Sequence, residues 1–314
     1  MRKAYLLGFL LFTLQQNFAQ IIRTELPDTI SYWKKSNKIG LDISQITFVN
    51  WNAGGNNSVS GLFKGNFIRE YSKKNLNWKN ELIFRYGINK QEGREVRKTD
   101  DQIQINSTIG FRKDTVSNWF YSGKFNFNTQ FANGYSYPNT EFAISKPFAP
   151  AYFFIGIGSE YSRKDLNLNV YLSPLTQKTT LVLDRRLANQ GAFGVDAAIY
   201  DEVTGELLQN GRKSRTEIGI LITNQWEKEI FKNINLEHRA SLYSDYLNNF
   251  GNIDIDWQLQ LNMTINEYVR ANIGTHLVYD DDVKAKEEKE GEQIIVGPKV
   301  QLKQLLGVGL VYTF

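Results

Sequence analysis

Apolar and polar residues alternate along most of this chain, and the alternation is clearest near its end. From Ile253 to Ile265 every odd-numbered residue is apolar and every even-numbered residue is polar. The alternation repeats over 269–279 and, with interruptions, over 300–314. Because successive side chains of a β-strand point to opposite faces, each segment predicts a strand with one apolar and one polar face. The last segment, about 15 residues, far exceeds the roughly 5–6 residues of a typical strand, whereas about 9–11 suffice for a tilted strand to cross a bilayer.

Further segments follow the same pattern and bring the predicted total to about twelve strands. In one of them, Trp119, Tyr121 and Phe125 fall on one face, and Ser122 and Lys124 on the other. The first of these segments alternates least clearly. The additional predicted strands are 39–50, 57–71, 78–88, 102–112, 119–131, 151–163, 166–173, 214–227 and 232–246.

The connections between these strands alternate in length, as in outer-membrane barrels, which have short periplasmic turns and long outside loops. We therefore predict an all-β fold: a closed transmembrane antiparallel β-barrel of about twelve strands, with both ends on the periplasmic side. The short connections are 72–75, 113–118, 163–165, 227–232 and 266–268, and the long ones are 89–100, 132–150, 174–213 and 281–298.

The segment 174–213 leaves the strand number open. Thr179–Asp184 and Ala192–Tyr200 are candidates for two extra strands, which would give about fourteen. The first of them is short for a membrane span. A folded loop is therefore the preferred interpretation, with Val203–Glu206 as the tip of a hairpin.

The start of the chain predicts export. Arg2 and Lys3 precede an apolar stretch, Leu6–Leu14, of signal-peptide length, and Ala19 before Gln20 is a plausible cleavage point. The predicted organisation is a signal peptide at 1–19, a periplasmic segment at 20–38 and the barrel at 39–314.

Composition narrows the alternatives. The chain has no cysteine, which excludes disulfides and thiolate metal sites, and its net charge of +4 gives no basic domain that would bind nucleic acid. It carries 20 Phe, 16 Tyr and 6 Trp, an aromatic content that suits membrane-interface girdles. Trp78, Trp119 and Trp226 fall at the predicted periplasmic rim, and Trp51 and Trp257 near the outer rim.

A soluble β-sandwich or small soluble barrel would alternate too. Its strands would be shorter, and its apolar faces would meet in one core. About twelve long, aromatic-rich apolar faces exceed what the interior of such a barrel accommodates, so the membrane barrel is the better interpretation.

Several runs, among them WNAGGNNSVSG, NLNWKNELIFRYG, RKTDDQIQINSTIG, GAFGVDAA and NIDIDWQLQLN, resemble a Bacteroidota-type outer-membrane β-barrel family of unknown function. The resemblance covers roughly 31–314. It implies an outer-membrane location in a Gram-negative cell, with lipids and lipopolysaccharide around the barrel, and it implies no activity. The ending GLVYTF resembles the signal that the barrel assembly machinery reads, with Leu310, Tyr312 and Phe314 at the matching places.

The polar faces of the strands are the main candidate site, because charges of both signs are predicted to point into the lumen. One interpretation is a passive channel for small polar solutes. The other is a cross-linked, non-conducting barrel that serves as a structural or accessory subunit beside other outer-membrane proteins. A barrel of this size lies between filled and open ones, so the sequence does not separate the two. The predicted lumen-lining residues are Lys64, Glu81, Arg85, Lys124, Glu160, Glu237, Arg239, Asp254 and Asp256.

Enzymatic chemistry is not predicted, and neither is a cofactor or a metal site. His238 lies on the apolar face, as the histidine of twelve-stranded outer-membrane phospholipases does, but Ala240 stands where a nearby hydroxyl would be needed. His276 lies on a polar face. The adjacent carboxylates Asp280–Asp282 lack the spacing of a calcium loop and are predicted to belong to a solvated outer loop.

Overall fold

The computed structural model describes residues 31–47, 56–248, 250–289 and 292–314. Residues 32–314 form one compact unit. The predicted signal peptide, most of the predicted periplasmic segment and Trp51 lie outside the described residues.

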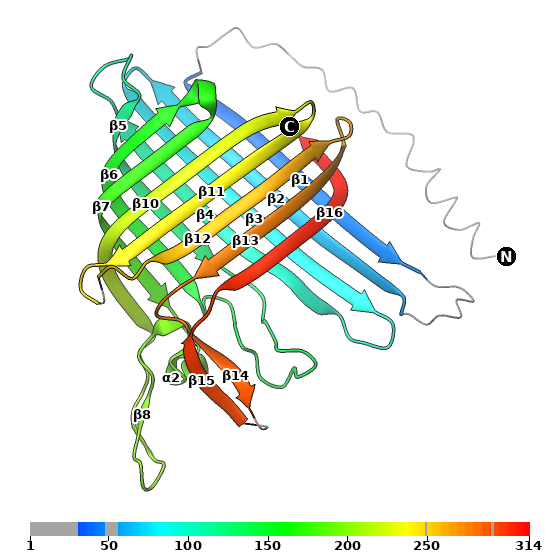
Figure 1. Ribbon diagram of the computed structural model, residues 1–314, viewed down its shortest axis with the longest axis vertical. Helices are drawn as coiled ribbons and strands as arrows, with labels where there is room; N and C mark the ends of the chain where they lie inside the picture. The colour runs from blue at the N-terminus through cyan, green and yellow to red at the C-terminus, as the bar shows by residue number, and fades with distance from the viewer. Residues whose placement is uncertain (1–30, 48–55, 249, 290–291) are drawn as a thin grey trace, which may run out of the picture. The chain divides into compact units, whose positions relative to one another are not determined.

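Twelve strands pair in one closed antiparallel barrel, which confirms the predicted fold class and the lower of the two strand numbers (Figure 1). Each strand pairs with its neighbour along the chain, and the last strand returns to the first. The barrel strands are β1 (Trp33–Ile46), β2 (Ser58–Lys73), β3 (Leu76–Gln91), β4 (Arg97–Phe111), β5 (Trp119–Thr129), β6 (Ala151–Arg163), β7 (Leu168–Leu181), β10 (Ser214–Phe231), β11 (Ile234–Asp245), β12 (Asp254–Thr264), β13 (Val269–Tyr279) and β16 (Gln301–Thr313).

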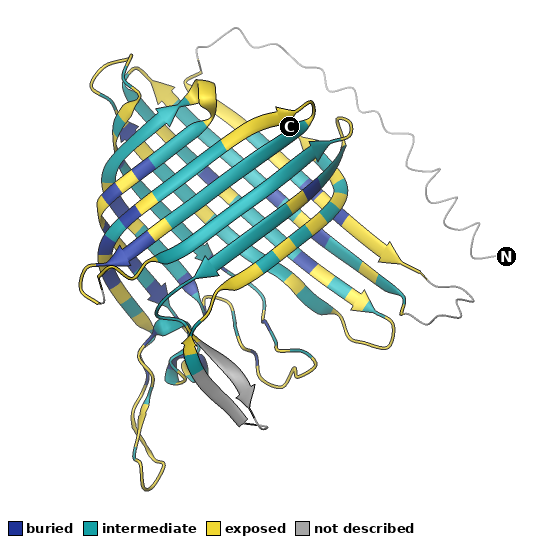
Figure 2. Ribbon diagram, viewed as in Figure 1, coloured by how far each residue is buried: buried dark blue, intermediate teal, exposed yellow. Residues whose placement is uncertain are grey.

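The polar and apolar side chains of each strand lie on opposite faces of the barrel wall. On β12 the polar residues Asp254 and Asp256 bond to side chains of other strands, Lys178 and His276. Large apolar side chains of the opposite face are exposed, among them Leu306, which is 76% exposed. Figure 2 shows buried positions scattered along the strands, without a single buried layer. An apolar belt of this kind on a closed barrel suits a lipid environment.

The two ends of the barrel differ as predicted. Short turns at 74–75, 112–118, 164–167, 232–233 and 265–268 lie at one end, here called the turn end, where β1 begins and β16 ends. The other end, here called the loop end, holds the long connections. The predicted long connection 89–100 is wrong: β3 and β4 extend into it and leave only 92–96 between them. Trp78, Trp119 and Trp226 lie near the turn end, and Trp257 lies near the loop end.

β7 is longer than the predicted strand 166–173. It continues through Pro174 to Leu181 because a bulge absorbs the proline: Ile157 pairs with Leu175, whereas Ser159 pairs with Leu172. Proline has no N–H to give to a ladder and is tolerated at such bulges. Gly158 opposes the bulge, where a side chain would collide with the Leu172 carbonyl.

β1 begins at Trp33, earlier than the predicted start at 39. Trp33 contacts Tyr71 and Trp78, with ring centroids 5.2 and 5.8 Å apart. Lys34 and Lys35 interrupt the apolar pattern at this rim, so the alternation is hard to recognise in the sequence.

The long connections carry their own structure. Connection 182–213 contains α2 (Arg185–Asn189), the 3-10 helix η3 (Ala192–Gly194) and a hairpin of β8 (Ile199–Tyr200) and β9 (Leu207–Gln209). The predicted tip Val203–Glu206 lies between these two strands. Connection 280–300 contains a second hairpin, β14 (Lys284–Lys289) and β15 (Glu292–Pro298). No helix in the described part of the chain is long and apolar enough to cross a membrane.

Candidate functional site: the lumen and its loop cap

Opposite walls of the barrel meet through one charged pair. Arg239 on β11 and Glu81 on β3 belong to strands that have five others between them on either side of the ring. Their side chains nevertheless approach to 3.8 Å, measured from Arg239 Nη1 to Glu81 Oε2. Arg239 also binds Glu237, with 2.5 Å between Nε and Oε1. These side chains therefore cross the lumen at its middle.

Glu81 is embedded in a network of amides. Its two carboxylate oxygens accept hydrogen bonds from Asn66 at 2.8 Å and from Asn106 at 3.1 Å. Asn106 in turn accepts from Gln104 and Asn126. A buried carboxylate is tolerated when its lone pairs are satisfied in this way, so the network holds Glu81 in place for Arg239.

A second bridge spans two intervening strands. Lys124 on β5 donates to Thr223 on β10 at 3.0 Å and lies over the ring of Tyr171, 5.2 Å from its centroid. Glu160 accepts from Asn169 at 2.5 Å on the neighbouring strand. Side chains of this wall therefore also bridge strands that are not neighbours in the ring.

Among the described residues the most buried cation is Lys178, which the sequence prediction missed because 174–213 was assigned to a loop. It is 4% exposed, and its ammonium lies 2.6 Å from Asp254, 3.2 Å from Asp280 and 3.5 Å from Glu217. The inward parity of β7 would have revealed it, had the strand been continued through Pro174. A buried ammonium needs this much compensation, so Lys178 ties β7, β10, β12 and the end of β13 together.

Arg215 extends this cluster towards the loop end. It binds Glu217 at 3.0 Å and Asp282 at 2.8 Å, and it donates to the carbonyl of Gly194 in η3. Asp280 and Asp282 therefore form ion pairs here, whereas the sequence predicted a solvated loop. The sequence does not show which distant cations pair with these adjacent carboxylates, because only the closed barrel brings them together.

Another group of charged side chains connects β16 with β3 and β4, which lie beyond β1 and β2 in the ring. Asp100 lies 3.0 Å from Arg85 and 2.8 Å from Lys303. Lys64 pairs with Asp42 at 2.7 Å, between neighbouring strands.

Each predicted lumen residue has a polar partner, but the structure does not gather them into one site. Three belong to the central bridge (Glu81, Glu237 and Arg239), and the others belong to separate groups. The remaining pairs are Lys64–Asp42, Arg85–Asp100, Lys124–Thr223, Glu160–Asn169, Asp254–Lys178 and Asp256–His276. Whether they line a conducting path stays a prediction.

Two long connections fold together into what we call the loop cap, residues 130–150 and 182–213. Ala149, Val182, Leu187, Ala188 and Val195 form a buried cluster, which Ala192 and Phe193 cover. The bond from Arg215 to Gly194 places the cap beside the Lys178 cluster at the loop end of the lumen.

Asp184 holds the cap in two ways. Its carboxylate accepts from the Leu187 amide at 3.0 Å, which caps α2, and it binds Lys146 of the other connection at 2.6 Å. Burial alone would raise the pKa of Asp184, but the bonds from Lys146 and the Leu187 amide outweigh it and hold the pKa below its usual value. Because a depressed pKa stabilises only the ionised form, this contribution is present at neutral pH and is lost as the pH falls through the lowered pKa.

We expect Asp184→Ala to loosen the cap. Loss of the N-cap costs about 1 kcal/mol, which raises the fraction of molecules with α2 unfolded roughly fivefold. Limited trypsin digestion should then cleave faster after Arg185 and Arg186. Asp184→Asn keeps a good N-cap and loses the ion pair, so its cleavage rate should lie between those of the unaltered protein and Asp184→Ala. Asp201→Ala, which affects the β8–β9 tip, is the control. Equal cleavage of all variants would contradict this account of the cap.

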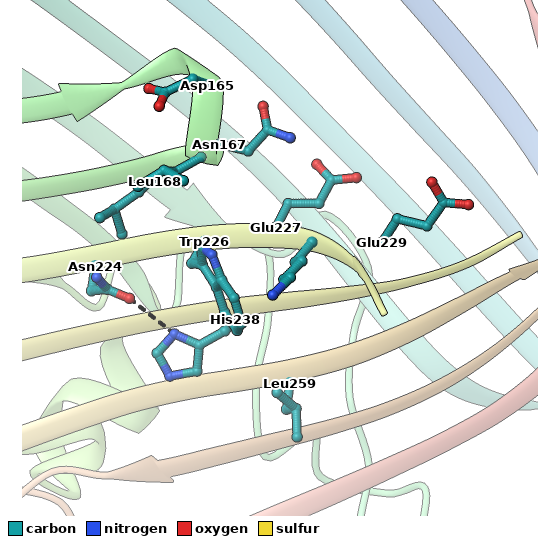
Figure 3. A pocket seen from close by; sticks show the side chains of 11 residues that line it. Asp165, Asn167, Leu168, Asn224, Trp226, Glu227, Glu229, His238 and Leu259 are labelled. Atoms are coloured by element: carbon teal, nitrogen blue, oxygen red, sulfur yellow. Dashed lines mark hydrogen bonds between the residues drawn. The ribbon is translucent and has the colours of Figure 1, made fainter. Parts of the chain in front are cut away.

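A groove of about 810 Å³ lies on the outer wall near the turn end (Figure 3). His238 and Asn224 bond within it, with 3.0 Å between Nδ1 and Oδ1. Asn224 occupies Nδ1 of the imidazole, and the residues that line the groove include no serine, threonine or cysteine that could act as a nucleophile beside it. The lining residues are Asp165, Leu166, Asn167, Leu168, Asn224, Trp226, Glu227, Lys228, Glu229, His238 and Leu259.

Metal-binding geometry is not found among the described residues: no three His, Asp or Glu side chains there are arranged to hold an ion. The carboxylates of the Lys178 cluster are directed at cations of the protein itself.

A model of the family described as "Protein of unknown function (DUF3078)" matches residues 43–135, less than half of the chain. The match agrees with a family of unknown function and gives no source organism. No curated protein sequence is significantly similar to the chain.

Solved structures similar to this chain include outer-membrane barrels. The translocator domain of the autotransporter NalP from Neisseria meningitidis is 9% identical, with 99% of this chain and 96% of that one covered and a TM-score of 0.39. An outer membrane channel from Pseudomonas putida F1 is 9% identical, with 91% and 99% covered and a TM-score of 0.41. The NanC porin is 10% identical, with 88% and 97% covered and a TM-score of 0.33. Similarities this weak do not bear on function.

Proposed function

We propose that this chain is an outer-membrane β-barrel that does not conduct in the state described, and that serves as a structural or accessory component with its folded loops outside the cell. The observation that carries the proposal is the Arg239–Glu81 pair, which joins opposite walls of the lumen.

The membrane location is supported by the outer face of the barrel. Ile157 and Leu306 are 68% and 76% exposed, and strands of 11 to 18 residues are long enough for tilted spans. The predicted signal peptide favours the outer membrane, where barrels of this kind are inserted. Surrounding lipids, lipopolysaccharide and the assembly machinery are then the expected partners.

The closed lumen is supported by how its charges are satisfied. Lys178 is surrounded by three carboxylates and Glu81 by two amides and a guanidinium. A passing ion would have to displace these partners, and each displaced charge would lose its compensation. The loop cap beside the Lys178 cluster adds a second obstacle at the loop end.

A passive channel for small polar solutes is the second candidate. Charged and amide side chains reach into the lumen from many strands, and charges need either partners or water. The mixture of signs argues against strong selectivity for anions or cations. In this alternative the cap and the central bridge would be a closed state of the channel.

Planar-bilayer recording of the purified protein separates the two functions. A non-conducting barrel should leave the membrane current at baseline over the usual voltage range, while protease protection of the same protein in proteoliposomes verifies that it inserts. Stable stepwise conductance would contradict the proposal and favour the channel.

A further inference from the structure

The barrel closes through a short seam. β1 and β16 pair from Lys38–Thr313 to Asp42–Gly309 and no further in the described chain. Continuing the same register would pair the next residues of both strands, Ile43 with Val308 through Ile46 with Leu305, and both strands do continue. In Figure 1 they run together near the end marked C and then diverge towards the loop end.

The other edges of the two strands are fully used. β1 stays paired with β2 as far as Ile46–Ser58, and β16 stays paired with β13 as far as Gln301–Val278. The split therefore leaves one edge of each strand without a partner strand, in the half of the barrel nearer the loop end. Within a bilayer, each backbone N–H or C=O group without a hydrogen-bond partner costs roughly several kcal/mol, because it is moved from water into hydrocarbon. We therefore expect another molecule or chain segment to occupy this edge.

The split stops at a specific contact. Asp42, 7% exposed, lies against Gly307 and Gly309, where a side chain would collide with its carboxylate. Lys64 holds the same carboxylate from β2 at 2.7 Å. This ion pair therefore lies at the last paired position of the seam.

The two sides of the split differ in chemistry. Outward-facing Ile43, Leu302 and Leu306 are 57%, 61% and 76% exposed. Behind the split, Asp100 connects Lys303 of β16 with Arg85 of β3, across β1 and β2. Together with Lys64 and Asp42, these side chains are three cations and two carboxylates, so the five of them carry one excess positive charge.

We propose that the β1–β16 split binds an anionic, phosphate-bearing lipid of the outer leaflet, for which phosphatidylglycerol is the probe. Its phosphate would lie near Lys303 and Arg85, and its acyl chain would pass between Ile43 and Leu306 into the membrane. Apolar walls outside and an excess cation inside match the two halves of such a lipid. This goes beyond the proposed function, because a lipid in the seam is compatible with either a silent or a conducting lumen.

Lipid retention tests the proposal. Protein purified in detergent is incubated with phosphatidylglycerol or phosphatidylcholine, washed, and examined by native mass spectrometry. We expect one phosphatidylglycerol to be retained, with several-fold less phosphatidylcholine. Lys303→Gln should lower phosphatidylglycerol retention several-fold, whereas Lys228→Gln on the outer wall should not change it.

Closing the split provides a second arm. Because the chain has no cysteine, Gln45→Cys with Leu306→Cys gives one possible disulfide, which should exclude the lipid until it is reduced. Thr179→Cys with Thr216→Cys is the matched control, since these residues pair on β7 and β10 with their hydroxyls 3.2 Å apart. Retention that is equal for both lipids, or unchanged in both the Lys303 variant and the closed seam, would overturn the proposal. Disulfide-linked dimers of the Gln45/Leu306 variant would also overturn it, in favour of strand pairing between two copies. If the seam disulfide does not form, the Lys303 and lipid arms decide.

Discussion

Removing the central bridge is expected to open the lumen. The double variant Glu81→Ala, Arg239→Ala deletes the two side chains that join opposite walls and leaves the strand ladders unchanged. Proteoliposomes that contain this variant should swell several-fold faster in a small sugar than those with the unaltered protein. The single variants should open less, because Glu237 still holds Arg239 and the two asparagines still hold Glu81.

The single variants should also be less stable. Each leaves a charge without its main partner across the lumen, at a cost of roughly 1–3 kcal/mol of unfolding free energy. The control is Arg163→Ala, Asp165→Ala, which removes an exposed ion pair at the turn end and should change neither swelling nor stability appreciably. A double variant that folds and swells no faster than the unaltered protein would show that this bridge does not close the lumen.

Replacing Tyr312 and Phe314 by alanine is expected to reduce the amount of protein in the outer membrane severalfold. β16 is the strand that the assembly machinery is expected to read. In the folded barrel these aromatics are 55% and 60% exposed and stack on each other, with ring centroids 5.6 Å apart. Their loss should therefore change the unfolding free energy by only about 1 kcal/mol or less. Quantitative blotting of membrane and periplasmic fractions measures the first effect, and urea unfolding of refolded protein the second.

Phe111→Ala is the matched control for this experiment. Phe111 ends β4 at the same rim of the barrel and is 53% exposed, but it is not part of the last strand. Its loss should leave membrane levels unchanged. An equal loss for Phe111→Ala would assign the effect to the aromatic rim in general and would contradict a signal in β16.

The strands were predictable from the sequence because each carries its own evidence. The alternation over 253–265 can be recognised without knowing which strand pairs with it, and β12 spans Asp254–Thr264 accordingly. The prediction was incomplete where a local rule was overridden. Pro174 argues for the end of a strand, but the bulge beside Gly158 lets β7 continue to Leu181. That error also concealed Lys178.

The candidate site was less predictable, for a geometric reason. Parity tells which face Arg239 and Glu81 occupy, but it does not tell which opposite strand a long side chain reaches. That depends on how the strands are ordered around the barrel and how far they are shifted against each other. The bond between His238 and Asn224 and the early end of the β1–β16 pairing depend on the same tertiary details, and no local motif marks them.

The most direct test of the account is the side of the membrane on which each end of the barrel lies. Val203 and Val116 are matched probes, because they are 95% and 87% exposed and lie at the loop end and the turn end. Because the chain has no cysteine, Val203→Cys and Val116→Cys each give one reactive thiol. A membrane-impermeant maleimide added to intact cells should label Val203→Cys, and should label Val116→Cys only after the outer membrane is permeabilised. Labelling of Val116→Cys on intact cells, or of Val203→Cys only after permeabilisation, would contradict a barrel that spans the outer membrane with its loop cap outside.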